Sequence, residues 1–283
     1  EVIYNDYRIQ KHAIIGHYRL LDPKDKQLAF GAYETCRQQL DELRQTGQIP
    51  ELPKHAVLVL HGLGAGRQYM QGLADHLERE GNLATVNIGY PSTLRTIEEH
   101  ADSLASIVRN LEGVETIDFV AHSMGNIVVR KYLYDLEQLD PSSRPPVTFR
   151  RMVMISPPNH GASSADRWVD SDLGKIVAGK PLDQLAPDRD WPELEAHLAT
   201  PDFQFGIIAG GRADDSGYLP SIPGDDDGLL SIETMRLAGA NDFIQTKGLH
   251  QLMARYKQVR QYTLAYLQNG FFISEAARQP VVN

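Results

Sequence analysis

The stretch "TIDFVAHSMGNIVVRKYLYDL", residues 116–136, joins a run of strand-forming residues to an amphipathic helix across a single serine. Two small residues, Ala121 and Gly125, stand two positions before and two positions after Ser123. In a tight strand–turn–helix connection, bulky side chains at these two positions would collide. The pattern therefore predicts a sharp turn that holds the Ser123 hydroxyl above the carboxyl end of a strand, where open parallel sheets bind ligands.

Short apolar runs alternate with helical segments on both sides of this turn. We expect further strands at residues 56–60, 83–90, 147–156, 203–211 and 242–248, and helices at 67–80, 94–111, from 124 onward and at about 251–267. Strands that alternate with helices form a mostly parallel sheet with helices on both faces. The predicted class is therefore α/β.

The 283 residues fit a single domain, 1–283, with two segments outside the alternation. Residues 1–55 form an amino-terminal extension, with a hairpin expected in 7–23 and a helix from Phe30 to Leu43. Residues of about 157–202 carry Trp168, Trp191 and several prolines. We expect this second segment to be a small lid- or cap-like insertion over the carboxyl ends of the strands.

A second motif, "HGLGAG" at residues 61–66, follows the strand two units before the serine turn. A dinucleotide-binding G-x-G-x-x-G loop would need glycine where Arg67 stands, and the Walker pattern is absent. Together with "AHSMGN" (121–126), the motif resembles the α/β-hydrolase fold, and most closely bacterial lipases and esterases, over about residues 56–267. The usual elbow is G-x-S-x-G, and here alanine stands first. The resemblance implies that Ser123 is the nucleophile and that the N–H groups of Leu63 and Met124 form the oxyanion hole.

The base of such an enzyme follows the last strand of the fold, which is the place of His250. For the acid, "DGLLSIE" (227–233) resembles the lipase pattern and selects Asp227, while "DDSGYLP" (214–220) leaves Asp214 or Asp215 as the alternative. The order serine, aspartate, histidine is the chain order of this fold. The remaining aspartates of the acidic run are expected to be solvated.

Other residues are assigned secondary roles. We expect His61 to brace the oxyanion loop and the His122 side chain to point away from the Ser123 hydroxyl. His160 is expected to line the wall of the cleft. An apolar acyl site is expected from a further set, whose members could equally belong to the core: Leu63, Tyr90, Met124, Ile127 and Trp168.

The resulting hypothesis is a serine carboxylic-ester hydrolase that acts on a small-molecule or lipid ester through an acyl-enzyme. An acyltransferase or thioesterase with the same nucleophile is the alternative, and a non-catalytic binding protein on the same scaffold is a third. The reaction implies no cofactor and no metal. The acidic run 225–227 does not form a calcium loop, because Pro223 and Thr234 occupy ligand positions of the EF-hand pattern.

Composition excludes several classes. A net charge of −9 argues against nucleic-acid binding, which depends on clustered Lys and Arg. Cys36 is the single cysteine, expected to be a small buried residue, so no intrachain disulfide can form. There is no apolar stretch of the ~18 residues that a membrane span needs. No signal peptide is visible, yet the sequence opens with Glu1, so removal of a preceding segment is one expectation and localisation is left open.

Overall fold

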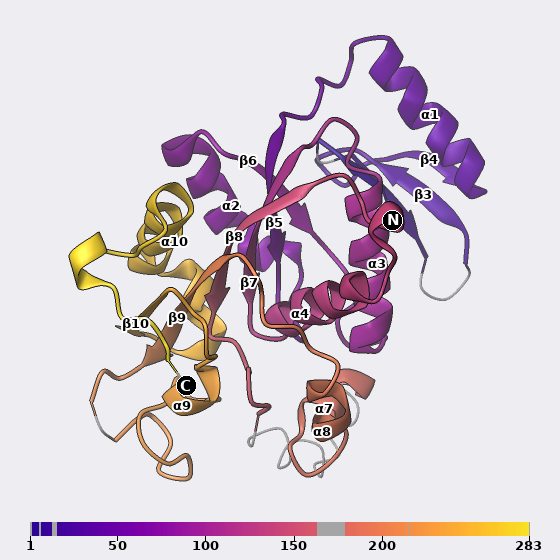
Figure 1. Ribbon diagram of the computed structural model, residues 1–283. Helices are drawn as coiled ribbons and strands as arrows, with labels where there is room; N and C mark the ends of the chain where they lie inside the picture. Colours follow the sequence, from indigo (N-terminus) through magenta and orange to yellow (C-terminus); the bar gives the residue numbers. More distant parts are fainter. Residues whose placement is uncertain (1, 6, 13–15, 163–178, 215, 283) are drawn as a thin grey trace.

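The computed structural model describes residues 2–5, 7–12, 16–162, 179–214 and 216–282. Its centre is a parallel sheet of six strands in the order β10-β9-β8-β7-β5-β6 (Figure 1). The strands are β5 (His55–Leu60), β6 (Ala84–Ile88), β7 (Thr116–His122), β8 (Thr148–Ile155), β9 (Gln204–Gly211) and β10 (Asp242–Lys247). All six coincide with strands predicted from the sequence.

The central strands are apolar because both faces of the sheet are covered. In β5 every residue after His55 is buried, and in β7 every residue after Thr116 is buried. Ala121 pairs with Leu60 of β5 and with Met154 of β8. This register brings the carboxyl ends of three strands to one edge, where the loops that follow them meet.

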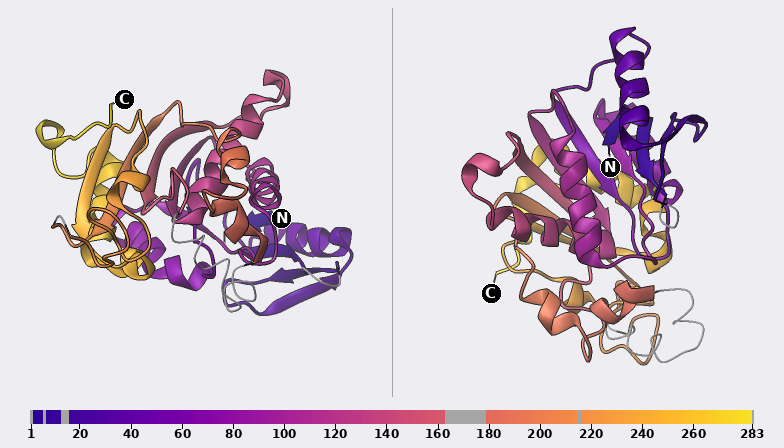
Figure 2. Two further views of the ribbon diagram at one scale, coloured as in Figure 1. Left: turned by 90° about the horizontal axis from the view of Figure 1, so that it is seen from below. Right: turned by 90° about the vertical axis from the view of Figure 1, so that its right-hand side faces the viewer.

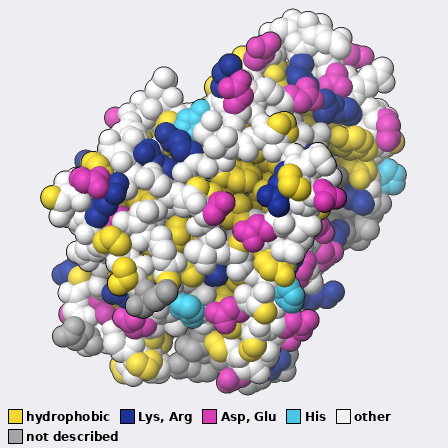
Figure 3. Space-filling model, in the orientation of Figure 1, with side chains coloured by type: hydrophobic (Ala, Val, Ile, Leu, Met, Phe, Trp, Pro, Cys, Tyr) yellow, Lys and Arg dark blue, Asp and Glu magenta, His cyan; other side chains and the backbone are white. Residues whose placement is uncertain are grey.

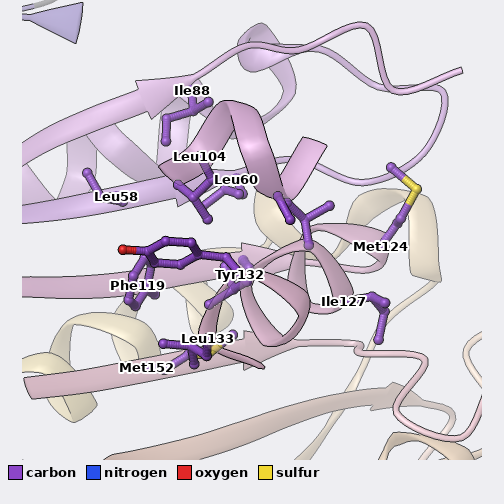
Figure 4. Close-up of a cluster of buried hydrophobic side chains, with 14 of the residues drawn as sticks. Leu58, Leu60, Ile88, Leu104, Phe119, Met124, Ile127, Tyr132, Leu133 and Met152 are labelled. Atoms are coloured by element: carbon purple, nitrogen blue, oxygen red, sulfur yellow. The ribbon is translucent and has the colours of Figure 1, made fainter. Parts of the chain in front are cut away.

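Four helices cover the two faces of this sheet. On one face, α2 (Arg67–Gly81) and α10 (Lys257–Asn269) pack on alternate residues of the strands, among them Val57 and Val59. On the other, α3 (Ile97–Arg109) and α4 (Met124–Glu137) pack on the intervening residues. Figure 4 shows this second core, in which Leu58, Leu60 and Phe119 of the sheet meet Leu104 and Ile127 of the helices.

The amino-terminal extension is a four-stranded antiparallel sheet followed by a helix. Its elements are β1 (Val2–Tyr4), β2 (Tyr7–Lys11), β3 (Tyr18–Leu21), β4 (Gln27–Gly31) and α1 (Tyr33–Gln45). The hairpin expected in 7–23 is present as β2 and β3. The predicted helix start was wrong, because Phe30 pairs with Arg19 in β4 and the helix begins only at Tyr33.

Buried residues of the extension, including Ile9, Leu20 and Cys36, join the same hydrophobic core as α3 and α4. The expected burial of Cys36 is thereby confirmed. Figure 2 shows the extension at one side of the molecule and α10 at the opposite side. The extension therefore adds a wall to the α3 face of the sheet.

Between β8 and β9 the structure describes two short helices, α7 (Gly179–Leu185) and α8 (Trp191–Glu195). Figure 1 places them below the sheet, at the end where the strands finish. Gln184 fixes α7 to the first turn of α3, because its side chain accepts from the Ile97 N–H at 2.8 Å and donates to Glu98. Trp191 is buried. Trp168 lies outside the described residues.

The remaining elements are short: η1 (Pro141–Ser143), α9 (Ile232–Met235), η2 (His250–Arg255) and η3 (Glu275–Ala277). In the part of the chain that the structure describes, no helix combines the length and the apolar character needed to cross a membrane.

Candidate active site

Ser123 occupies a backbone conformation that residues other than glycine seldom adopt, with φ 53° and ψ −129° between β7 and α4. Hydrogen bonds hold it there, among them one from the Asn126 main-chain N–H to the Ser123 carbonyl at 3.0 Å. The Ser123 N–H donates to the carbonyl of Ile155 at 2.9 Å, and the Asn126 side-chain amide donates to the Ser123 carbonyl at 2.9 Å. Strain of this kind is concentrated at functional sites. The role of Asn126 was not predicted, although its place three residues after the serine suits such a contact.

Two glycines allow this turn to form against the loop that follows β5. A Cβ atom on Gly125 would lie 2.7 Å from the His61 carbonyl oxygen, and one on Gly62 would lie 2.8 Å from the Ser123 Cβ. Both distances are shorter than real Cβ contacts, so side chains at either position would push the serine turn and the 61–66 loop apart. The spacing that marked Gly125 in the sequence thus has a steric cause.

The three residues predicted as nucleophile, base and acid lie in one continuous set of hydrogen bonds. His250 Nε2 is 2.8 Å from Ser123 Oγ, and His250 Nδ1 is 2.7 Å from Asp227 Oδ2. Because a carboxylate can only accept, Nδ1 carries the imidazole proton and Nε2 accepts from the serine hydroxyl. The exposed fraction is 9% for Ser123, 4% for His250 and 0% for Asp227.

Asp227 is held by the loop that contains it. Its second carboxylate oxygen accepts from the N–H groups of Leu229 and Leu230, at 3.1 and 2.8 Å, and its carbonyl accepts from the His250 N–H at 2.8 Å. Hydrogen bonds to the charged form stabilise a buried carboxylate. These backbone donors take the place of bulk water around the Asp227 carboxylate, which has no exposed surface.

The other acidic candidates are placed elsewhere. Asp214 is exposed and binds Ser216 and Arg212, and Asp215 lies outside the described residues. The expectation that the unused aspartates are solvated was wrong for Asp226, which is fully buried and accepts from the N–H groups of Leu219 and Gly228. Within a folded loop, backbone donors replace water around this carboxylate.

The loop 61–66 is braced by His61, as predicted. Its ring stacks on Tyr90 at 4.2 Å between centroids; its Nδ1 lies 2.9 Å from the Gly62 carbonyl, and its Nε2 accepts from the Tyr90 N–H at 3.3 Å. The Tyr90 hydroxyl donates to the His61 carbonyl. Burial lowers the pKa of His61, which favours the neutral ring that this pattern requires.

Two main-chain donors lie in this region without an acceptor. Neither the Leu63 N–H nor the Met124 N–H donates a hydrogen bond to any residue that the structure describes. Leu63 follows Gly62, whose Cα closely approaches Ser123, and Met124 opens α4. The start of a helix favours negative charge. Neither group thus has an acceptor among the described residues, as a role in binding a substrate oxygen would require.

The side chains that were expected to contact a substrate lie in different surroundings. Tyr90 is half-buried against His61, whereas Ile127 has no exposed surface and lies in the core. His160 is exposed and its Nδ1 lies 3.2 Å from Glu195 Oε1. Trp168, as noted, is outside the described residues. Tyr90 thus contacts the 61–66 loop through His61.

On the face that Figure 3 shows, acidic and basic side chains are interspersed. Among the described residues, no group of three or more His, Cys, Asp or Glu side chains is arranged to hold a metal ion.

Known proteins resemble this chain in structure and not detectably in sequence: no protein-family model matches it, and no curated protein matches it. The product of the lin2722 gene of Listeria innocua superimposes with a TM-score of 0.53 at 18% identity, over 80% of this chain and 96% of that one. The mature lipase BlEst2 of Bacillus licheniformis gives 0.52 at 15% identity, over 77% and 91%. With its parallel sheet flanked by helices, the chain has the α/β-hydrolase fold.

Proposed function

We propose that the chain is a serine carboxylic-ester hydrolase that acts through an acyl-enzyme. The observation that carries the proposal is the hydrogen-bonded series Ser123–His250–Asp227 at the end of β7, with a strained serine at its head. A nucleophile beside a base that is itself oriented by a third group is the arrangement expected for covalent catalysis.

In the first half of the reaction, Ser123 Oγ attacks the acyl carbonyl while its proton passes to His250 Nε2. Asp227 stabilises the resulting imidazolium through Nδ1–H and does not take the proton itself. The negative charge that develops on the carbonyl oxygen is bound by the N–H groups of Leu63 and Met124. Each donor of this kind contributes roughly 3 kcal/mol to transition-state stabilisation.

His250 then returns the proton to the departing alcohol, and the acyl group remains on Ser123. In the second half, His250 removes a proton from a water molecule, which attacks the acyl carbonyl. The bond between the acyl group and Ser123 Oγ then breaks, His250 returns the proton to Oγ, and the carboxylic acid is released. The base therefore acts twice as acceptor and twice as donor, so its hydrogen bond to Asp227 matters in both halves.

The substrate class we assign is a small-molecule or lipid carboxylic ester. Hydrolysis of p-nitrophenyl esters of increasing acyl length distinguishes a lipase from an esterase. A rate that rises for long chains above their micellar threshold indicates a lipase, and a preference for short chains indicates an esterase.

The experiment that tests the proposal compares Ser123→Ala with Ser156→Ala. Ser156 is a matched control, because it also ends a strand with positive φ (43°) and is buried, yet its hydroxyl has no partner among the described residues. We expect Ser123→Ala to lose both labelling by a fluorophosphonate probe and hydrolysis of p-nitrophenyl butyrate, and Ser156→Ala to keep both. Ester hydrolysis that survives in folded Ser123→Ala would refute the proposal.

A further inference from the structure

The loop that follows β6 holds the 61–66 loop from the side opposite Ser123. In the sheet β5 lies between β7 and β6, and Leu60 pairs with Ile88, so the loops after these strands leave one edge side by side. The serine turn lies on one flank of the 61–66 loop, and residues 89–92 lie on the other. Contacts on this second flank therefore help to set where the 61–66 loop stands relative to the serine.

Ser92 contacts the main chain of the 61–66 loop at two places. Its hydroxyl accepts a hydrogen bond from the Gly64 N–H at 3.1 Å and donates to the Ala65 carbonyl at 3.4 Å. A serine hydroxyl can accept and donate at the same time. The exposed fraction of Ser92 is 3%, so the hydroxyl is shielded from bulk water. Ser92 thus serves two main-chain groups that lie just after Leu63.

The main chain of Ser92 is itself held in a tight turn. The Ser92 N–H donates to the Tyr90 carbonyl at 2.8 Å, which closes a three-residue turn around Pro91. The pyrrolidine ring fixes φ of a proline at about −65°, close to the value that such a turn favours. The Leu94 N–H then donates to the Pro91 carbonyl at 2.9 Å. The segment is therefore a firm support for the Ser92 side chain.

The two bonds of Ser92 act on a turn that contains Leu63. The Ala65 N–H donates to the Gly62 carbonyl at 3.3 Å, and φ of Gly64 is 69°, which is the combination expected of a type II turn. Leu63 is the first of the two central residues of this turn. Because Ser92 binds the N–H of the second central residue, it restrains the peptide group that follows Leu63.

The same segment holds the loop on the other side of Leu63. The Tyr90 hydroxyl donates to the His61 carbonyl, and the Tyr90 N–H donates to His61 Nε2 at 3.3 Å. Leu63 therefore lies between two attachments, one made by Tyr90 and one made by Ser92. Main-chain donors stabilise a developing negative charge well when they are held in place before the charge appears.

We propose that Ser92 is a positioning residue for the oxyanion hole, an inference that rests on the function proposed for Ser123. Ser92 forms no hydrogen bond with Ser123 or His250 in the described structure. Its hydroxyl keeps the turn in the form that places the Leu63 N–H at the acyl carbonyl. Because the carbonyl oxygen becomes negatively charged only in the transition state, loss of this hydroxyl lowers kcat and leaves KM nearly unchanged.

Steady-state hydrolysis of p-nitrophenyl butyrate by Ser92→Ala tests the proposal. We expect kcat to fall about tenfold and KM to change less than about twofold, since the donor is displaced and not deleted. Thr96→Ala is the matched control, because Thr96 lies on the same loop and its hydroxyl also accepts from a main-chain N–H, that of Glu99 at 3.3 Å. This change removes a helix cap and should lower the midpoint of urea unfolding, yet leave kcat unchanged.

A transition-state analogue separates positioning from a general loss of structure. Ser123 Oγ adds to the carbonyl carbon of propyl trifluoromethyl ketone while its proton passes to His250 Nε2, and the carbonyl oxygen becomes the anion that the hole binds. The Ki of this ketone should rise in Ser92→Ala by the factor by which kcat falls. In Thr96→Ala the Ki should equal that of the wild type.

Two results would overturn the inference while the wild type still hydrolyses the ester. One is an unchanged kcat in Ser92→Ala, or an equal fall in Thr96→Ala. The other is a lower kcat in Ser92→Ala with an unchanged Ki for the ketone. Failure of the wild type to hydrolyse any ester of the series would instead refute the proposed function, and the role of Ser92 with it.

Discussion

The imidazole of His122 lies under the loop that carries His250, and its Nε2–H donates to the main-chain carbonyl of His250 at 3.0 Å. On the other side of that residue, the His250 N–H donates to the Asp227 carbonyl. The main chain of the proposed base is therefore held at both of its polar groups. Burial, together with the neighbouring His250, depresses the pKa of His122 well below its ordinary value, so it is neutral at pH 7.

Replacement of His122 by Phe is expected to keep the ring packing and to remove this donor. The buried His250 carbonyl is then left unpaired, which costs about 1–3 kcal/mol of unfolding free energy. We also expect kcat for p-nitrophenyl butyrate to fall roughly tenfold, because small displacements of a catalytic group reduce the rate. Urea unfolding and steady-state kinetics check both effects. His197→Phe, at an exposed histidine, is the control and should change neither.

Asp227→Asn is expected to reduce kcat by roughly 10³–10⁴-fold with little change in KM, as loss of the orienting carboxylate does in serine proteases. The amide can no longer accept from Nδ1–H while bonding the Leu229 and Leu230 N–H groups in the same way. Asp214→Asn is the matched control, since Asp214 was the alternative acid and lies on the same loop in an exposed position. If Asp214→Asn proved the more damaging change, the assignment of the acid would be wrong.

Stability should depend on pH through His100. Burial lowers the pKa of His100 to about 4, from 6.5 in a model compound. Because the folded form binds fewer protons than the unfolded chain between these values, its contribution is intact above pH 6.5 and is lost as the pH falls toward 4. The expected loss between pH 7 and pH 5 is about 2 kcal/mol.

Unfolding by urea at the two pH values measures this loss, and His100→Phe is expected to remove most of it. The variant keeps an aromatic ring against Tyr90, whose centroid is 4.7 Å away, and eliminates the two ring nitrogens that can be protonated. If the free energy of unfolding of the variant changed with pH as much as that of the wild type, groups other than His100 would cause the pH dependence. His61 and His122 are such groups, because their pKa values are also lowered.

Much of the fold and the order of the candidate site could be predicted because both depend on local patterns. The strand, the serine and the small residues around it are adjacent in sequence, and the turn they form is adjacent in space. Asp227 and His250 follow strands whose carboxyl ends lie at the same edge, so chain order alone brings them near Ser123. That these residues act in catalysis stays a prediction.

What could not be predicted depends on contacts between distant segments. Asp226 is buried because Leu219, on a separate turn of the loop, supplies its donor. Ile127 stands at a helical position that suits a core residue and a substrate-contacting residue equally well. Its packing against the sheet assigns it to the core. Phe30 belongs to a strand because β3 is there to pair with it. Propensity alone cannot supply a partner strand.

The close approach of Gly62 to Ser123 leads to a final prediction. A methyl group at residue 62 would stand 2.8 Å from Ser123 Cβ and 3.2 Å from His122 Nδ1, so Gly62→Ala must shift the 61–66 loop away from the serine turn. The Leu63 N–H moves with that loop, and we expect kcat to fall about 10²-fold, consistent with the loss of one oxyanion donor. KM and fluorophosphonate labelling should change less.

Gly89→Ala is the matched control for this change. Gly89 also follows the end of a strand, but the three atoms nearest to a Cβ there all belong to Arg67 and lie at ordinary contact distances of 3.5 Å and beyond. Gly89 has no positive φ, so the added methyl group carries no backbone strain. We expect normal kcat in this variant. Equal activity of the two variants would mean that the loop tolerates displacement, and the Leu63 N–H could then not be the donor on which the proposed oxyanion hole depends.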